Sequence, residues 1–137
     1  MTHLLNSIEQ AIKNQTLGYS KLSEEEAEVE LAKLKEAFRF DYKVLHLWGH
    51  NWENREICEY GEGWGKELSR YLKDFADCIY LVVTDDEFYP WVVYYGEKRE
   101  LKGLLEEQRF FEYFVFDHSC KKVLFDTHHN SLILFRR

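Results

Sequence analysis

The sequence predicts an α+β fold, in which about four helices pack on one antiparallel sheet of about five or six strands. Two observations lead to this prediction. Apolar residues follow helical and strand spacings in the order α-α-β-α-β-β-α-β-β-β, and several consecutive strands are joined by turns too short for a parallel crossover. The 137 residues, 45% hydrophobic and 17% aromatic, are expected to form a single α+β domain over residues 1–137.

Two amphipathic helices are predicted at the start of the chain. The first covers residues 3–15. The second starts at Ser23, because "SEEE" fits a capping box in which the hydroxyl caps backbone donors and Glu26 reaches back. The glutamate run suits the positive end of the helix dipole, so we interpret it as a solvated helix start in preference to an acidic docking site. The apolar stripes are Leu4, Leu5, Ile8, Ala11 and Ile12 in the first helix, and Ala27, Leu31, Leu34 and Phe38 in the second.

The middle of the chain is predicted to form a strand, a loop and a helix. Residues 42–48, "YKVLHLW", alternate like a strand. Residues 49–63 are polar and glycine-rich, which favours an irregular loop with a short turn of helix or strand. A helical stripe then runs from Trp64 to Phe75, and this helix should end near Asp77. One face of the strand would carry Tyr42, Val44, His46 and Trp48.

The second half of the chain is rich in strand-forming residues. Residues 78–84 and 91–95 are β-branched and aromatic, and the connection between them predicts a hairpin with an acidic tip. Residues 98–109 are predicted to form a fourth helix, although Gly103 lowers its helix propensity. The tip carboxylates are Asp85, Asp86 and Glu87, and the three closing strands cover residues 111–117, 122–127 and 131–135.

Several of these strands carry large apolar groups on both faces. Phe114 and Phe116 alternate with Tyr113 and Val115 along one strand. Such a strand needs cover on both sides. The sequence therefore predicts that helices cover both faces of the sheet, or that one aromatic face meets a partner.

Composition narrows the classes of function. The formal net charge of −7 argues against nucleic acid as the main partner and favours approach to a basic protein surface. The three cysteines have no CxxC spacing, so neither a disulfide framework nor a zinc ribbon is indicated. The N-terminus lacks the features of a signal peptide, and no apolar run is long enough to span a bilayer. We expect a cytoplasmic protein.

The stretch "DTHHN" at residues 126–130 raises the question of a metal site. If the strand continues through residue 129, His128 shares a face with Asp126 and His129 points the other way, so the two histidines cannot bind one metal together. No HExxH motif is present. The sequence predicts no metal and no cofactor, and it leaves a site built on His46, Asp126 and His128 as an alternative.

Catalytic motifs are also missing from the sequence. Cys120 lies two residues after His118, but proximity in a turn does not establish a nucleophile and its base. No GxSxG motif is present. "GEGWG" at residues 61–65 is not a phosphate-binding loop, and Glu62 at its centre would repel phosphate. No catalytic residue is predicted, and an enzymatic role is left open.

Three tryptophans, Trp48, Trp52 and Trp64, occur in and around the least regular segment. Aromatic side chains in loops anchor either the local core or a protein interface. The burial usual for tryptophan favours the core.

The C-terminal third, "FFEYFVFDHSCKKVLFDTHHNSLILF", resembles the ending of small bacterial immunity-like proteins of polymorphic toxin systems. The resemblance covers roughly residues 110–135. It implies a cytosolic α+β protein that binds one toxin domain and blocks it, with no catalysis and no cofactor. The matching positions are Glu112, Tyr113, Phe114, Asp126, His128, His129 and Asn130.

The sequence therefore predicts a non-enzymatic protein-binding domain, of the immunity type, that inhibits a cognate bacterial toxin, and the net charge favours a basic one. The alternatives are a small enzyme or metal-binding domain built on His46, Asp126 and His128, and a ligand-binding or adaptor domain with an aromatic pocket. The sequence does not indicate the oligomeric state. The expected partner-binding residues are Trp48, Trp52, Trp64, Asp85, Asp86, Glu87, His128 and His129.

Overall fold

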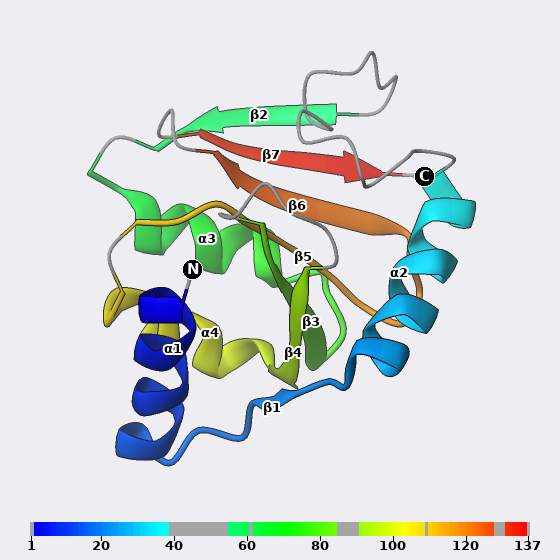
Figure 1. The fold of residues 1–137 in the computed structure, drawn as a ribbon. Helices are drawn as coiled ribbons and strands as arrows, with labels where there is room; N and C mark the ends of the chain where they lie inside the picture. Colours follow the sequence, from blue (N-terminus) through cyan, green and yellow to red (C-terminus); the bar gives the residue numbers. More distant parts are fainter. Residues whose placement is uncertain are drawn as a thin grey trace.

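The fold is described from a computed structural model, in which four α-helices surround one sheet (Figure 1). The structure describes residues 2–38, 55–60, 62–84, 91–108, 110–127 and 131–136. The helices are α1 (Thr2–Gln15), α2 (Glu24–Phe38), α3 (Trp64–Leu72) and α4 (Leu101–Glu106), and the short 3-10 helix η2 (Lys98–Glu100) leads into α4.

All seven described strands belong to one antiparallel sheet, in the order β1-β4-β3-β5-β6-β7-β2. This confirms the predicted α+β class, although the sheet has more strands than the five or six expected. The strands are β1 (Ser20–Lys21), β2 (Arg55–Glu59), β3 (Cys78–Val83), β4 (Val92–Glu97), β5 (Tyr113–Phe116), β6 (Lys122–Thr127) and β7 (Ser131–Arg136).

The additional strands lie at the two edges of the sheet. β1 has only two residues and pairs with β4, and β2 forms within the segment predicted to be mainly loop. Neither shows a clear strand pattern in the sequence, because pairing with a neighbour rather than local propensity defines them. The strand predicted over residues 42–48 lies outside the described residues.

Two helices are shorter than the sequence predicts. α3 ends at Leu72 rather than near Asp77, because the next residues turn toward β3: the Phe75 N–H donates to the Leu72 carbonyl at 3.0 Å, and the Ala76 N–H donates to Asp117 Oδ2 at 2.9 Å. The helix predicted over residues 98–109 divides into η2 and α4. The apolar spacing typical of a helix thus extends beyond the α-helix into turns, where the backbone does not form the hydrogen bonds of an α-helix.

The capping box predicted at Ser23 is confirmed. The Glu26 N–H donates to Ser23 Oγ at 3.1 Å, and the Ser23 N–H donates to Glu26 Oε1 at 3.0 Å. These reciprocal bonds satisfy backbone donors that the first turn of α2 would otherwise leave open.

The sheet separates two hydrophobic clusters. One lies between the sheet and α1, α3 and α4, and the other lies between the sheet and α2. In Figure 1, α2 stands apart from the other three helices. Of the two alternatives predicted for the sheet, cover by helices on both faces is therefore the one found.

Strand β5 occupies the middle of the sheet, between β3 and β6. Its four residues are at most 3% exposed, and they alternate between the two clusters: Tyr113 and Val115 face one, and Phe114 and Phe116 face the other. Phe114 and Phe125 lie directly opposite each other on neighbouring strands, with ring centroids 5.0 Å apart. The centre of the sheet is thus aromatic and buried on both sides.

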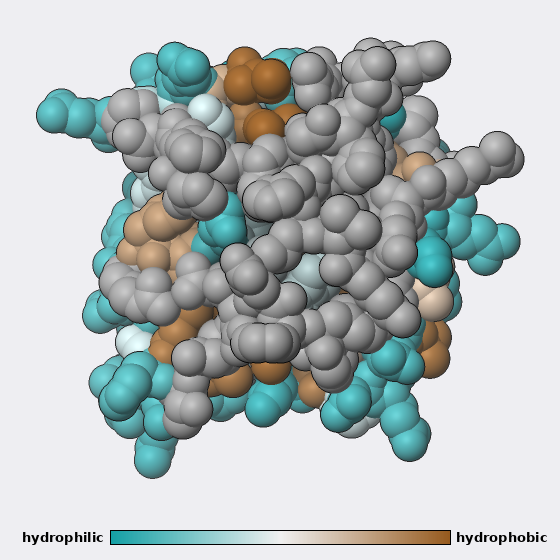
Figure 2. All heavy atoms as spheres, turned by 45° about the horizontal axis from the view of Figure 1, so that its top comes forward, coloured by the Kyte–Doolittle hydropathy of each residue, from teal (hydrophilic) through white to brown (hydrophobic). Residues whose placement is uncertain are grey.

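The surface carries few large hydrophobic side chains among the described residues. Val29 on α2, Ile57 on β2 and Phe110 before β5 are 55%, 53% and 47% exposed. Figure 2 shows brown hydrophobic atoms at a few places on one face and teal hydrophilic atoms along much of its outline. Among the described helices, none combines the length and apolar character needed to cross a membrane.

Gly96 allows the segment after α1 to pack closely on β4. The Tyr19 side chain is 5% exposed, and its hydroxyl donates to the Glu97 carbonyl at 2.7 Å. A Cβ atom added at Gly96 would lie 2.6 Å from the Tyr19 ring. A side chain at Gly96 would therefore push the ring off the sheet.

We predict that Gly96→Ala lowers the free energy of unfolding by about 1–3 kcal/mol, because the added methyl group overlaps a buried ring. Urea unfolding followed by tryptophan fluorescence measures this change. Gly18→Ala is the matched control, since its added Cβ would lie at an ordinary 3.4 Å from Glu100 Oε1. The control should change stability by no more than about 1 kcal/mol, and equal losses in both variants would contradict this packing account.

Candidate functional site

One buried carboxylate joins four elements on the α1, α3 and α4 side of the sheet. Asp126 on β6 is 2% exposed. Its Oδ1 accepts a hydrogen bond from the Tyr60 hydroxyl at 2.8 Å, and its Oδ2 accepts bonds from Trp64 Nε1–H at 2.9 Å and from the Tyr113 hydroxyl at 2.7 Å. The donors belong to the residue after β2, the first residue of α3 and the start of β5. We call these four residues the Asp126 site.

The register of the sheet explains part of this arrangement. Tyr113 and Asp126 are direct partners in the β5–β6 pair, so their side chains lie on the same face. Trp64 and Tyr60 reach the carboxylate from segments that are distant in the sequence. The Asp126 site therefore depends on tertiary packing as well as on strand pairing.

The donors of the Asp126 site are all neutral, so its carboxylate is held by hydrogen bonds rather than by an ion pair with them. Burial raises the pKa of the Asp126 carboxyl above its usual range, and the bonds from Tyr113, Trp64 and Tyr60 offset only part of that rise. Burial followed by the charge of Asp126 also raises the pKa of the Tyr113 and Tyr60 hydroxyls. Both phenols therefore remain donors near neutral pH.

A cavity of about 390 Å³ lies beside the Asp126 site. Trp64 is half-buried and packs against the core, and Phe110 lies exposed at the edge of the cavity. The Oε1 of Gln108 is buried without a hydrogen-bond partner among the described residues. The lining residues are Tyr60, Trp64, Leu105, Glu106, Gln108, Phe110, Phe111, Tyr113 and Asp126.

Two of the residues singled out by the sequence meet in this site. Trp64 was expected to bind a partner or the core, and Asp126 belongs to the alternative metal or catalytic set; the structure joins them by a hydrogen bond. Whether Trp64 contacts a partner stays a prediction. The other predicted site residues lie outside the described residues: His46, Trp48, Trp52, Asp85, Asp86, Glu87, His128 and His129.

The described ranges contain no group of three His, Cys, Asp or Glu residues that could hold a metal ion. A metal at Asp126 would have to displace donors that already occupy both carboxylate oxygens. β6 is assigned as far as Thr127, so the expected split of His128 and His129 across opposite faces stays a prediction.

A second buried carboxylate, Asp117, closes the turn between β5 and β6. Its Oδ2 accepts the Ala76 N–H at 2.9 Å, and its Oδ1 accepts the Ser119 N–H at 3.0 Å and the Ser119 hydroxyl at 2.5 Å. Burial alone would raise the pKa of this carboxyl. The bonds from Ala76 and Ser119, aided by the charge of Lys122, more than offset burial and lower the pKa.

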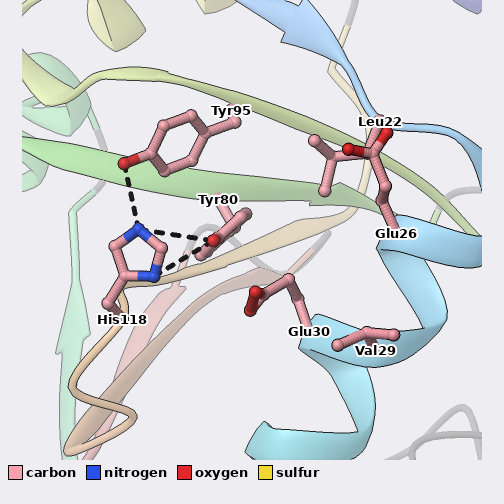
Figure 3. A pocket seen from close by; sticks show the side chains of 7 residues that line it. All are labelled: Leu22, Glu26, Val29, Glu30, Tyr80, Tyr95 and His118. Carbon is pink, nitrogen blue, oxygen red and sulfur yellow. Dashed lines mark hydrogen bonds between the residues drawn. The ribbon is translucent and has the colours of Figure 1, made fainter.

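A different pocket lies on the α2 side of the sheet (Figure 3). One of its lining residues is His118, whose ring nitrogens lie 3.1 Å from two tyrosine hydroxyls: Nδ1 from Tyr80 and Nε2 from Tyr95. Its volume is about 290 Å³. The residues that line it, and that define the His118 pocket, are Leu22, Glu26, Val29, Glu30, Tyr80, Tyr95 and His118.

The rings of the His118 pocket hold one another in place. Tyr80 and Tyr95 are direct partners in the β3–β4 pair, and their ring centroids are 4.7 Å apart. The His118 ring stands edge-on to Tyr80, at 5.1 Å and 84°. Burial, and next the nearby Glu30 carboxylate, raise the pKa of the Tyr80 hydroxyl. The pocket thus presents rings and carboxylates to a ligand.

The sequence prediction missed the His118 pocket. From the sequence we consider His118 only beside Cys120, and we interpret the glutamates as a helix start. Alternation places Tyr80 and Tyr95 on strand faces, but their pairing follows from the β3–β4 register. No local sequence pattern predicts that α2 lies over that pair.

Neither Cys58 nor Cys120 has the surroundings of a reactive thiol. Burial, together with a hydrogen bond to Glu67, raises the pKa of the Cys58 thiol, which lowers its nucleophilicity. Cys120 is buried and occupies the left-handed region with φ of 51° in the β5–β6 turn. Its position in that turn gives it a structural role.

No protein-family model, curated protein or solved structure matches this chain. The resemblance of the C-terminal third to immunity-like proteins therefore stays a prediction. Function has to be inferred from the geometry and charge of the two sites.

We predict that Asp126 and Asp117 affect the pH dependence of stability with opposite signs. The Asp126 pKa is raised in the folded protein, so its contribution to stability falls as the pH rises from about 4 through the folded value. The Asp117 pKa is lowered, so its contribution is lost as the pH falls below about 4. Urea unfolding from pH 2.5 to 7 measures both effects.

The matched variants are Asp126→Asn and Asp117→Asn, each of which should lose about 1–3 kcal/mol at pH 7, because an amide nitrogen then faces hydrogen-bond donors. The loss caused by Asp117→Asn should grow with increasing pH, and the loss caused by Asp126→Asn should shrink. The same pH trend in both variants would show that the carboxylate environments are wrongly assigned.

Proposed function

We propose that the chain is a protein-binding domain that binds and blocks a basic partner, of the immunity type that inhibits one bacterial toxin domain. The observation that carries this proposal is the open His118 pocket beside the acidic half of α2. Aromatic rings and carboxylates together suit contacts with basic side chains. Neither the Asp126 site nor Cys58 or Cys120 offers an equally exposed reactive group.

The acidic half of α2, residues 24–30, supports this proposal through its charge. Its sequence "EEEAEVE" contains five glutamates and no lysine or arginine. Four of these glutamates are exposed. The net charge of −7 acts in the same direction, because an acidic surface steers a basic protein toward productive encounters. Val29 is 55% exposed within this segment and offers an apolar contact.

Blocking is a further part of the proposal, and the resemblance of residues 110–135 to immunity-like proteins supports it. An inhibitor of this class needs tight, specific binding but no catalytic group. Central anchors surrounded by a polar rim give such binding. In the His118 pocket, the aromatic rings correspond to the central anchors and the glutamates correspond to the polar rim.

A second candidate function is ligand binding in the cavity beside the Asp126 site. The observation that favours it is the buried Gln108 Oε1, which has no partner among the described residues. The cavity volume of about 390 Å³ falls within the range usual for small-molecule sites. A ligand with a hydrogen-bond donor and an apolar body would suit this lining.

The proposal is tested with the protein encoded directly upstream of this chain. We predict that expression of its C-terminal domain alone stops bacterial growth, and that co-expression of this chain restores growth and yields a stable complex. A harmless upstream domain, or growth arrest that co-expression does not relieve, would refute the immunity-type function.

We also predict how charge affects formation of that complex. Reversal of Glu24, Glu25 and Glu28 to lysine should slow association by about tenfold or more at low ionic strength, and the effect should shrink as salt rises. Stopped-flow fluorescence measures the association rate. Reversal of Glu62, Asp74 and Glu107, which are also exposed, is the control of equal charge. Equal slowing by both sets would mean that net charge, not the α2 surface, determines association.

The acidic tip predicted from the sequence provides a further comparison. Reversal of Asp85, Asp86 and Glu87 in the same assay shows whether this segment also steers the partner. An unchanged association rate and affinity would remove the tip from the proposed interface.

A further inference from the structure

The His118 pocket has the size of a site for one side chain. Its volume of about 290 Å³ lies just below the ~300–1,000 Å³ that is usual for small-molecule sites. Helix α2 forms one wall, strands β3 and β4 form another, and His118 closes the end nearest the β5–β6 turn. Such a pocket suits an anchor side chain from a partner.

The charge in the pocket is concentrated at Glu30. Figure 3 shows the Glu30 side chain reaching from α2 toward Tyr80 and His118. Glu26, one turn earlier, also lines the pocket, but its Oε1 accepts the Ser23 N–H of the capping box. Glu30 is therefore the carboxylate that an entering group would meet, with Glu26 adding negative charge at the rim.

Glu30 already binds a cationic group from its own helix. The Lys33 Nζ lies 3.1 Å from Glu30 Oε1 and 3.4 Å from Oε2. The Lys33 side chain is 59% exposed, so this ion pair is weak and easily exchanged. Both oxygens of Glu30 thus lie within hydrogen-bond distance of one donor, and the Tyr80 hydroxyl also hydrogen-bonds Glu30.

The rings offer the second half of a cation site. Phe116 stacks on Tyr80 at 4.9 Å, so that ring is covered on one side by the core. Tyr95 is half-buried and His118 is exposed, which leaves these two rings available to the pocket. Hydrogen bonds between His118 and both tyrosines fix the ring orientations before a ligand arrives.

We infer that the His118 pocket takes one arginine side chain of the partner, with the guanidinium group paired to Glu30 and stacked on the Tyr95 ring beside His118. The inference rests on the proposed function, because it names the group by which a basic partner is anchored. Arginine fits better than lysine, since its planar fork pairs with both oxygens of a carboxylate and its flat face stacks on rings.

The pocket can be tested without the partner. N-acetyl-arginine amide is titrated into the full chain, and the Tyr95 and His118 resonances are followed by NMR. We expect saturable shifts with a dissociation constant in the millimolar range. The lysine amide should bind at least about threefold more weakly, and the neutral citrulline amide should produce no saturable shift.

Three variants locate the site. Glu30→Gln should weaken arginine amide binding by about tenfold, because it removes the charged acceptor. Glu25→Gln is the matched control on the same helix and should change binding by less than about twofold, since screening weakens distant exposed charges. Lys33→Gln should strengthen binding, because it removes the lysine that already pairs with Glu30. Unchanged melting temperatures confirm that the variants are folded.

The outcomes separate this inference from the proposed function. Absence of a saturable shift, or equal weakening by Glu30→Gln and Glu25→Gln, would overturn the arginine site. Unchanged toxin binding by Glu30→Gln would also overturn it and leave the proposed function standing. Saturable arginine binding that depends on Glu30, found with a harmless upstream domain, would support the pocket and refute the toxin partner.

Discussion

Strand β5 has no face that can be left to water, and this constraint shapes the molecule. Its four residues are buried and divide their side chains between two clusters. Burial of large apolar groups on both sides is the dominant stabilising contribution, so helices must lie on both sides of the sheet. The arrangement of α1, α3 and α4 on one face and of α2 on the other satisfies that need. Both candidate sites lie where these helices meet the sheet.

The two sites differ in how their polar groups are stabilised. Asp126 is deeply buried and uses neutral donors from separate segments, so it links those segments to the sheet. Glu30 and His118 remain close to solvent and keep partners that can be exchanged. A buried polar network gives specificity to a fold, whereas a half-open one is suited to recognition. This difference supports the proposal that recognition takes place at the His118 pocket.

The sequence predicts the elements of this fold better than their contacts. The α+β class, the capping box at Ser23 and the need for cover on both sheet faces follow from periodicity and local chemistry. The Tyr113–Asp126 pair could also have been predicted, because the short turn between the two strands fixes which residues lie opposite each other. Trp64 and Tyr60 join Asp126 only through tertiary packing. The same holds for Glu30 beside His118, because no local pattern specifies where a helix lies on a sheet.

The order of strands in the sheet also has a consequence for how the protein folds. β5, β6 and β7 follow one another in the sequence and in the sheet, whereas the edge strands β1 and β2 pair with partners far along the chain. Closing a long loop costs more conformational entropy than closing a hairpin, so the central meander can form first and serve as a template for both edges. Unfolding can follow the reverse order, in which an edge strand detaches while the aromatic centre of the sheet stays folded.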